Sequence, residues 1–145
     1  MPKNSKTLHK ELTKKYKALD KTRTNFEAAF AASILNNEDI SQAYAGLYLD
    51  LFTEFESLIE KLFIGLLTGT VTPNNPGVGK IVTIKPVTGV ESVLLSGKAF
   101  LDWLPYADNT IKRSKIYFTD SKPFSFLSQP QKDKLTNYHK IRNAI

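Results

Sequence analysis

The sequence contains no cysteine, one methionine, one tryptophan and two histidines. Without cysteine, the chain can form neither disulfides nor thiolate-ligated metal sites. The two histidines, His9 and His139, are far apart in the sequence, so they do not indicate a metal site, and we expect no metal and no cofactor. The longest apolar stretch, residues 58–67, contains Glu60 and Lys61 and is too short to span a bilayer. The N-terminal residues lead into a charged segment and not into a signal core, so we expect a cytoplasmic protein with no membrane partner.

The chain has 145 residues, of which 41% are hydrophobic and 23% are charged, and it includes nine Phe and six Tyr. This length suits one domain with a self-sufficient core, and the composition is that of an ordinary globular protein. We therefore expect a single domain over residues 1–145.

The net charge of +6 is unevenly distributed along the chain. Residues 1–23 and residues 112–145 each contain eight Lys or Arg and two Asp or Glu, whereas residues 24–111 contain four Lys and ten Asp or Glu. Two basic ends suit a polyanion such as RNA, whose phosphates attract Lys and Arg whatever the base sequence. The alternative for the N-terminal segment is a solvated helix face that serves only solubility.

The first half of the chain predicts two long helices. Apolar residues at spacings of three, four and seven predict a helix over residues 5–35, with the lysines mostly off its apolar stripe. A second helix is predicted from Ser41, as its N-cap, to about residue 67, and Gly69 suits the turn that ends it. Its broad apolar surface is typical of the central helix of a bundle. Asp50 and Glu54 lie four residues apart on its polar strip, where paired carboxylates either do acid–base chemistry or simply face water.

Residues 70–96 differ in character from the flanking helices. Turn-forming residues precede a β-branched run over residues 80–85, a second turn follows, and residues 90–95 suit a returning strand. Shorter helices are predicted over residues 96–104 and from Asn109 or Thr110 to residue 118. The sequence therefore predicts an all-α fold, an antiparallel bundle of about four to five helices with an inserted β-hairpin around residues 79–95.

A final helix is predicted from Ser128, a suitable N-cap, with Pro130 in its first turn. Its apolar stripe, which we expect to face the core, consists of Leu135, Tyr138, Ile141 and Ile145. On a helical wheel Arg142 lies about 45° from the centre of this stripe, at the margin of the buried face. An arginine there either extends to water beside the core or lines a groove, where it can bind a phosphate bidentately.

The segment Tyr138-His139-Lys140-Ile141-Arg142-Asn143-Ala144-Ile145 resembles the terminal-helix motif of HEPN domains. That motif is an arginine, commonly followed by asparagine or another polar residue, and then a histidine after four to six intervening positions. The resemblance extends loosely over residues 41–145 and includes the segments 45–60, 100–106 and 123–127. Arg142 matches the motif arginine and Asn143 matches the polar residue that follows it.

The resemblance implies a helical bundle that commonly dimerises, with a cleft between protomers. Many members are metal-independent endoribonucleases of toxin or antiviral systems, whereas others are inactive RNA-binding or scaffold modules. On this basis we expect Arg142 and Asn143 to be catalytic positions. We expect Lys134, His139 and Lys140 to contact RNA. The expected partners are RNA, a second copy of the chain, and an antitoxin or other protein.

The chain departs from the motif at its histidine, which would fall at positions 147 to 149, and His139 precedes the arginine. The mid-pattern end of the amphipathic helix favours a chain cut before that histidine, so we expect residues 1–145 alone to lack RNA cleavage. Two alternatives stay open. One is a non-catalytic HEPN scaffold that binds RNA or a protein, and the other is an unrelated helical interaction domain in which Arg142 is a helix-margin residue.

Overall fold

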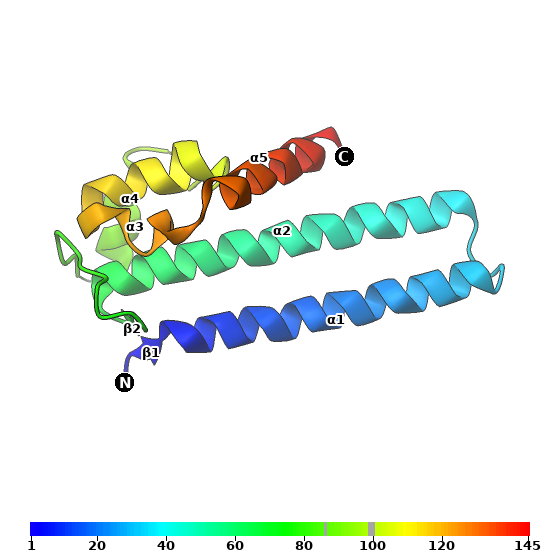
Figure 1. The fold of residues 1–145 in the computed structure, drawn as a ribbon, viewed down its shortest axis with the longest axis horizontal. Coiled ribbons are helices and arrows are strands. Elements are labelled where there is room, and N and C mark those ends of the chain that lie inside the picture. Colours follow the sequence, from blue (N-terminus) through cyan, green and yellow to red (C-terminus); the bar gives the residue numbers. More distant parts are fainter. Residues whose placement is uncertain (86, 99–100) are drawn as a thin grey trace.

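The computed structural model describes residues 1–85, 87–98 and 101–145. These residues form five α-helices, three short helical turns and one two-stranded parallel sheet. The prediction of an all-α helical bundle is confirmed. Figure 1 shows α2 in the middle of the molecule, with α1 along one side and the shorter helices along the other.

Helices α1 (Ser5–Ala31) and α2 (Asn37–Thr68) form an antiparallel hairpin (Figure 1). α2 begins four residues before the predicted Ser41, because Asn36 provides the stronger cap. Its side chain accepts hydrogen bonds from the backbone N–H groups of Glu38 and Asp39, and the Asp39 carboxylate accepts one from the Asn36 N–H. This reciprocal capping box satisfies N–H groups that have no partner within the helix.

The other end of α2 is fixed to the N-terminus of the chain. Gly69 ends the helix in the left-handed conformation, with φ of 79°, as its position predicts. Strand β2 (Val71–Thr72) follows and pairs in parallel with β1 (Lys3–Asn4), which leads directly into α1. The short sheet therefore joins the start of α1 to the end of α2.

The predicted β-hairpin at residues 79–95 is wrong. Val87–Leu95 is a helix, α3, in which Val90 and Leu94 are buried one turn apart. The preceding segment pairs instead with residues at the end of α4 (Lys112–Tyr117) and just after it. Lys80 forms an antiparallel bridge with Phe118, and the Ile81 N–H donates to the Tyr117 carbonyl at 2.8 Å. Burial against α2 outweighs the β propensity of the valines.

The predicted helix over residues 96–104 is also wrong in its described part, since residues 96–98 and 101–104 are not helical. Residues 99–100, like Pro86 in the predicted hairpin turn, lie outside the described residues. Gly97, with φ of 85°, follows the end of α3. The next helical segment begins at Tyr106 and not at a cap on Asn109 or Thr110. It consists of a π-helical turn, η1 (Tyr106–Ile111), that continues into α4 (Lys112–Tyr117).

The core is an aromatic cluster around Phe63 of α2. The Phe63 ring centroid lies 5.1 Å from that of Trp103 and 5.0 Å from those of Phe118 and Phe124. The last two residues belong to the segment that contains the 3₁₀ turns η2 (Thr119–Ser121) and η3 (Phe124–Phe126). The core therefore lies between the C-terminal half of α2 and the segments that follow it.

Helix α5 (Gln129–Ala144) begins as predicted, with Ser128 as N-cap in a second capping box. Its predicted buried stripe is wrong. Tyr138, Ile141 and Ile145 are 46%, 50% and 55% exposed, and only Leu135 packs against the core. The helix contacts α2 mainly through polar side chains, as described below.

Candidate functional site

Two polar contacts join the C-terminal half of α5 to the middle of α2. The Tyr48 hydroxyl donates a hydrogen bond to the Tyr138 carbonyl at 2.9 Å. Arg142 Nη1 donates to Glu56 Oε1, also at 2.9 Å, and the two side chains form an ion pair. These contacts hold residues 138–142 of α5 against α2.

Arg142 lies at a protected but accessible position. Its side chain is 33% exposed and that of Glu56 is 26% exposed, so the pair is only partly shielded from water. A guanidinium has five N–H donors, and among the described residues Arg142 uses one of them, for Glu56. The remaining donors leave Arg142 able to bind a second oxyanion, or to exchange Glu56 for one. The sequence placed Arg142 beside a stripe that proves to be exposed, so its partial burial has a different origin, the contact with Glu56.

His139 and Asn143 lie next to Arg142 on the same helix. The Asn143 side-chain amide lies 3.2 Å from His139 Nε2, one helical turn away. The other ring nitrogen of His139, Nδ1, is buried and has no hydrogen-bond partner among the described residues. Asn143 and His139 therefore form a polar pair on α5, while Arg142, beside Asn143 in the sequence, contacts Glu56 of α2.

The two predicted RNA-binding lysines do not join this pair. Lys134 and Lys140 are both exposed. Lys140 lies about 160° around the helix from Arg142, and Lys134 lies two turns closer to the start of α5. Of the five predicted site residues, the structure places His139 and Asn143 in contact with each other.

The sequence pattern did not indicate the two residues of α2 that hold α5, Glu56 and Tyr48. Glu56 could have been suspected, because an arginine at the margin of a buried face needs a carboxylate or another acceptor nearby. Nothing in the sequence indicated which of the acidic residues of α2 meets it.

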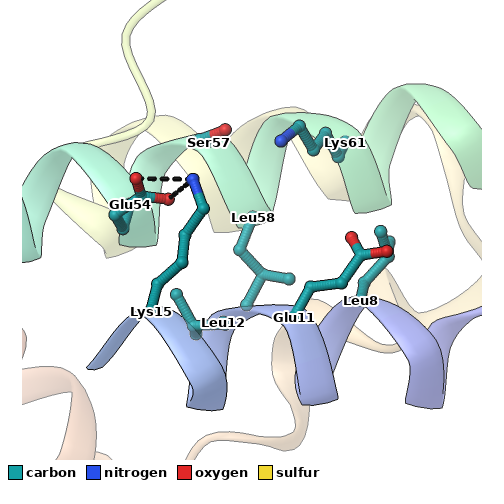
Figure 2. Close-up of a pocket in the computed structure, with 8 residues that line it drawn as sticks. All are labelled: Leu8, Glu11, Leu12, Lys15, Glu54, Ser57, Leu58 and Lys61. Atoms are coloured by element: carbon teal, nitrogen blue, oxygen red, sulfur yellow. Dashed lines mark hydrogen bonds and ion pairs between the residues drawn. The ribbon is translucent and has the colours of Figure 1, made fainter. Parts of the chain in front are cut away.

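Of the two carboxylates predicted as a pair on α2, Asp50 is exposed and Glu54 pairs with a lysine of α1. Figure 2 shows Lys15 reaching from α1 to Glu54, whose two oxygens accept hydrogen bonds from Lys15 Nζ at 2.6 and 2.5 Å. Glu60 instead accepts a hydrogen bond from Trp103 Nε1 at 3.0 Å.

Burial, and secondarily the nearby Glu54 carboxylate, raises the pKa of the Tyr16 hydroxyl. The cavity drawn in Figure 2 has a volume of about 30 Å³, enough for little more than a water molecule.

Among the described residues, no three His, Asp or Glu side chains are grouped so that they could hold a metal ion. None of the helices in the described ranges has the length and apolar character needed to cross a membrane.

Comparisons of the chain with protein-family models, with curated proteins and with solved structures found no match.

Proposed function

We propose that this chain is an HEPN-like RNA-binding domain of a metal-independent endoribonuclease from a toxin or antiviral defence system, in which Arg142 contacts an RNA phosphate. The observation that carries the proposal is the position of Arg142, which is partly buried, oriented by Glu56 and left with unused donors. The helical architecture agrees with the bundle that the resemblance to HEPN domains implies.

The chemistry of Arg142 suits an exchange of oxyanions. Glu56 and an RNA phosphate are both acceptors for the Arg142 guanidinium, and a phosphate accepts two parallel N–H donors. Glu56 therefore orients the arginine when no RNA is bound, and its carboxylate competes with the phosphate. His139 and Asn143 supply further polar groups within a turn of the same helix.

Binding of a fluorescein-labelled single-stranded RNA, measured by anisotropy over a range of salt concentrations, tests this proposal. Arg142→Gln should weaken binding and lower the slope of log affinity against log salt by about 0.7 to 1, the effect of one lost phosphate contact. Lys115→Gln is the matched control, because it removes one exposed positive charge from α4 and should change the slope little.

Glu56→Gln separates a phosphate contact from a purely structural ion pair. If Arg142 binds phosphate, removal of the competing carboxylate should tighten RNA binding. If the pair only attaches α5 to α2, Arg142→Gln and Glu56→Gln should both lower the melting temperature and leave RNA affinity unchanged. The second result would contradict the proposal.

A protein-binding function is the second candidate, and the exposed apolar residues of α5 favour it. Tyr138, Ile141 and Ile145 are about half exposed along one side of the helix. An apolar groove of about 260 Å³ also lies between the C-terminal half of α1 and the N-terminal half of α2. Leu19 and Leu47 are among its lining residues. We propose a second copy of the chain as the partner, as the HEPN resemblance implies.

Analytical ultracentrifugation at increasing protein concentration tests this partner. Ile141→Asp should weaken self-association, whereas Ile116→Asp, at a residue of α4 that is 64% exposed, should not. A protein that stays monomeric at about 100 μM, or an equal effect of both substitutions, would count against the second copy.

A further inference from the structure

The outward face of α1 carries lysines and no acidic residues. At about 100° per residue, five lysines lie within about 80° of one another on the helix, on the side opposite the buried Leu8. We call these residues the lysine stripe: Lys6, Lys10, Lys14, Lys17 and Lys21. All five are exposed. Along the helix axis the stripe extends over about 22 Å, with steps of about 4.5 to 6 Å between neighbouring lysines.

The other cations near this surface have acidic partners. Lys3 pairs with Glu11, Lys15 with Glu54, and Arg23 with Asp20 and Glu27. In the ranges that the structure describes, by contrast, no carboxylate pairs with any lysine of the stripe. The charges of α1 are therefore sorted, with paired cations on its flanks and unpaired ones on its outward face.

This sorting is unfavourable for an isolated helix. Like charges three or four residues apart repel each other, and the stripe consists entirely of such neighbours. Lys6 also lies in the first turn, where the helix dipole disfavours a cation. A face that served only solubility would gain from interspersed acidic residues, as on the flanks. The stripe is therefore better suited to a bound polyanion than to water alone.

The residues around the stripe indicate which polyanion fits. The remaining positions of α1 within about 60° of its centre are small or polar: Thr7, Thr13, Thr24, Asn25, Ala28 and Ala31. The face has no aromatic residue on which bases could stack and no large apolar residue that could insert into a lipid surface. It can therefore contact phosphates, but it can neither stack on bases nor anchor in a membrane.

We propose that the lysine stripe binds the phosphate backbone of double-stranded RNA without regard to sequence. A duplex hides its bases and presents successive phosphates along its length, which suits a straight row of ammonium groups. α1 and α5 lie on opposite sides of α2 (Figure 1), so this surface is separate from Arg142. Only the choice of RNA over DNA rests on the proposed function.

The test uses a 20-base-pair RNA duplex of mixed sequence and a variant in which Lys10, Lys14, Lys17 and Lys21 are all replaced by Gln. Affinity at about 0.1 M salt should fall about 100- to 1,000-fold, and the salt slope should fall by about 3 to 4. Glutamine is a good helix former, so α1 should stay intact, as circular dichroism and the melting temperature will show. The same four positions replaced by Arg should retain binding.

The matched control removes the same charge from four exposed lysines elsewhere: Lys85, Lys98, Lys112 and Lys115, each replaced by Gln. Equal losses in both quadruple variants would mean that only net charge matters and would overturn the proposal. Unchanged duplex binding by the stripe variant would also overturn it. So would stripe-dependent binding to phosphatidylserine vesicles without binding to the duplex.

Arg142→Gln, measured beside these variants, distinguishes the two proposals. Its effect on single-stranded RNA should persist in the stripe variant, because distant sites act additively. A stripe variant that binds duplex normally removes only the stripe proposal. An Arg142→Gln protein that binds single-stranded RNA normally removes only the proposed role of Arg142.

Discussion

The two ends of the α1–α2 hairpin differ in what covers them. At one end α2 packs against α3, η1, α4 and the turns around Phe124, and the aromatic core surrounds Phe63. At the other end, beyond the contact of Tyr48 with α5, only α1 and α2 lie together (Figure 1). In residues 9–51, all of which the structure describes, no side chain is buried. The stability of the fold is therefore concentrated at the first end, which we call the closed end. The second end, which we call the open end, keeps its side chains available.

Truncation of the core should give the largest effect. Phe63→Ala removes a ring that is 0% exposed and contacts three other buried rings, so the free energy of unfolding should fall by about 3 to 5 kcal/mol. Leu47→Ala, at a half-buried position of the open end, should cost about 1 kcal/mol. Urea denaturation measures both, and Phe63→Leu provides a milder variant if Phe63→Ala does not fold. Equal losses of unfolding free energy in Phe63→Ala and Leu47→Ala would show that stability is not concentrated at the closed end.

The same substitution at two glycines of α2 should act in opposite directions. A Cβ at Gly65 would lie 2.3 Å from Val71 Cγ2 and 2.8 Å from Val71 Cβ, so Gly65→Ala forces β2 away from the helix and should cost about 1 to 3 kcal/mol. A Cβ at Gly46, in the open end, meets nothing within 4 Å. Gly46→Ala should therefore stabilise the protein by about 0.5 to 1 kcal/mol through helix propensity. Thermal and urea denaturation of the two variants would show the difference in sign.

Removal of a tyrosine hydroxyl should give the smallest difference in stability between the two ends, and the one that depends most on pH. At the closed end the buried Tyr106 hydroxyl donates to the Phe124 carbonyl at 2.8 Å, so Tyr106→Phe should cost about 1 to 2 kcal/mol near neutral pH. Tyr44→Phe at the open end loses an exposed hydrogen bond to Glu27 and should change stability little.

The pH dependence of the same variants follows from burial, which raises the pKa of the Tyr106 hydroxyl well above its ordinary value. A raised pKa in the folded state stabilises the protein below the pKa of the unfolded chain, about 10, and this contribution is lost as the pH rises further. Above pH 10 the parent protein should therefore lose stability more steeply than Tyr106→Phe. Parallel curves up to pH 11 would contradict this.

The parts of the fold that the sequence predicted are those governed by local rules. The two long helices follow from the spacing of apolar residues, and Gly69 and Ser128 mark a helix end and a helix start through backbone conformation and capping. These signals depend on a few neighbouring residues, so they can be read without knowledge of the packing. The Asn36 cap carries the same kind of local signal, with Asp39 three residues later, although Ser41 also fits the rule for an N-cap.

The parts that failed depend on contacts between distant segments. Val90 and Leu94 suit a strand by composition, yet they are buried on one side of α3 because α2 offers an apolar surface there. In α5 the amphipathic pattern predicts the helix correctly but not its inner face, since α2 presents Tyr48 and Glu56 to it. Hydrophobic spacing finds the helix, whereas its rotation about its own axis depends on the neighbour.

The unequal burial along α2 also sets how fast its backbone exchanges hydrogen for deuterium. Amides near Phe63 and Leu67, both 0% exposed, open only when the whole core unfolds, so their exchange reports global stability. Amides in the first turns after Asn36, where no side chain is buried, should open through local fraying of the hairpin and exchange much sooner. One uninterrupted 32-residue helix should therefore contain both fast-exchanging and slow-exchanging amides. The position at which protection from exchange rises marks the part of the α1–α2 hairpin that unfolds only together with the core.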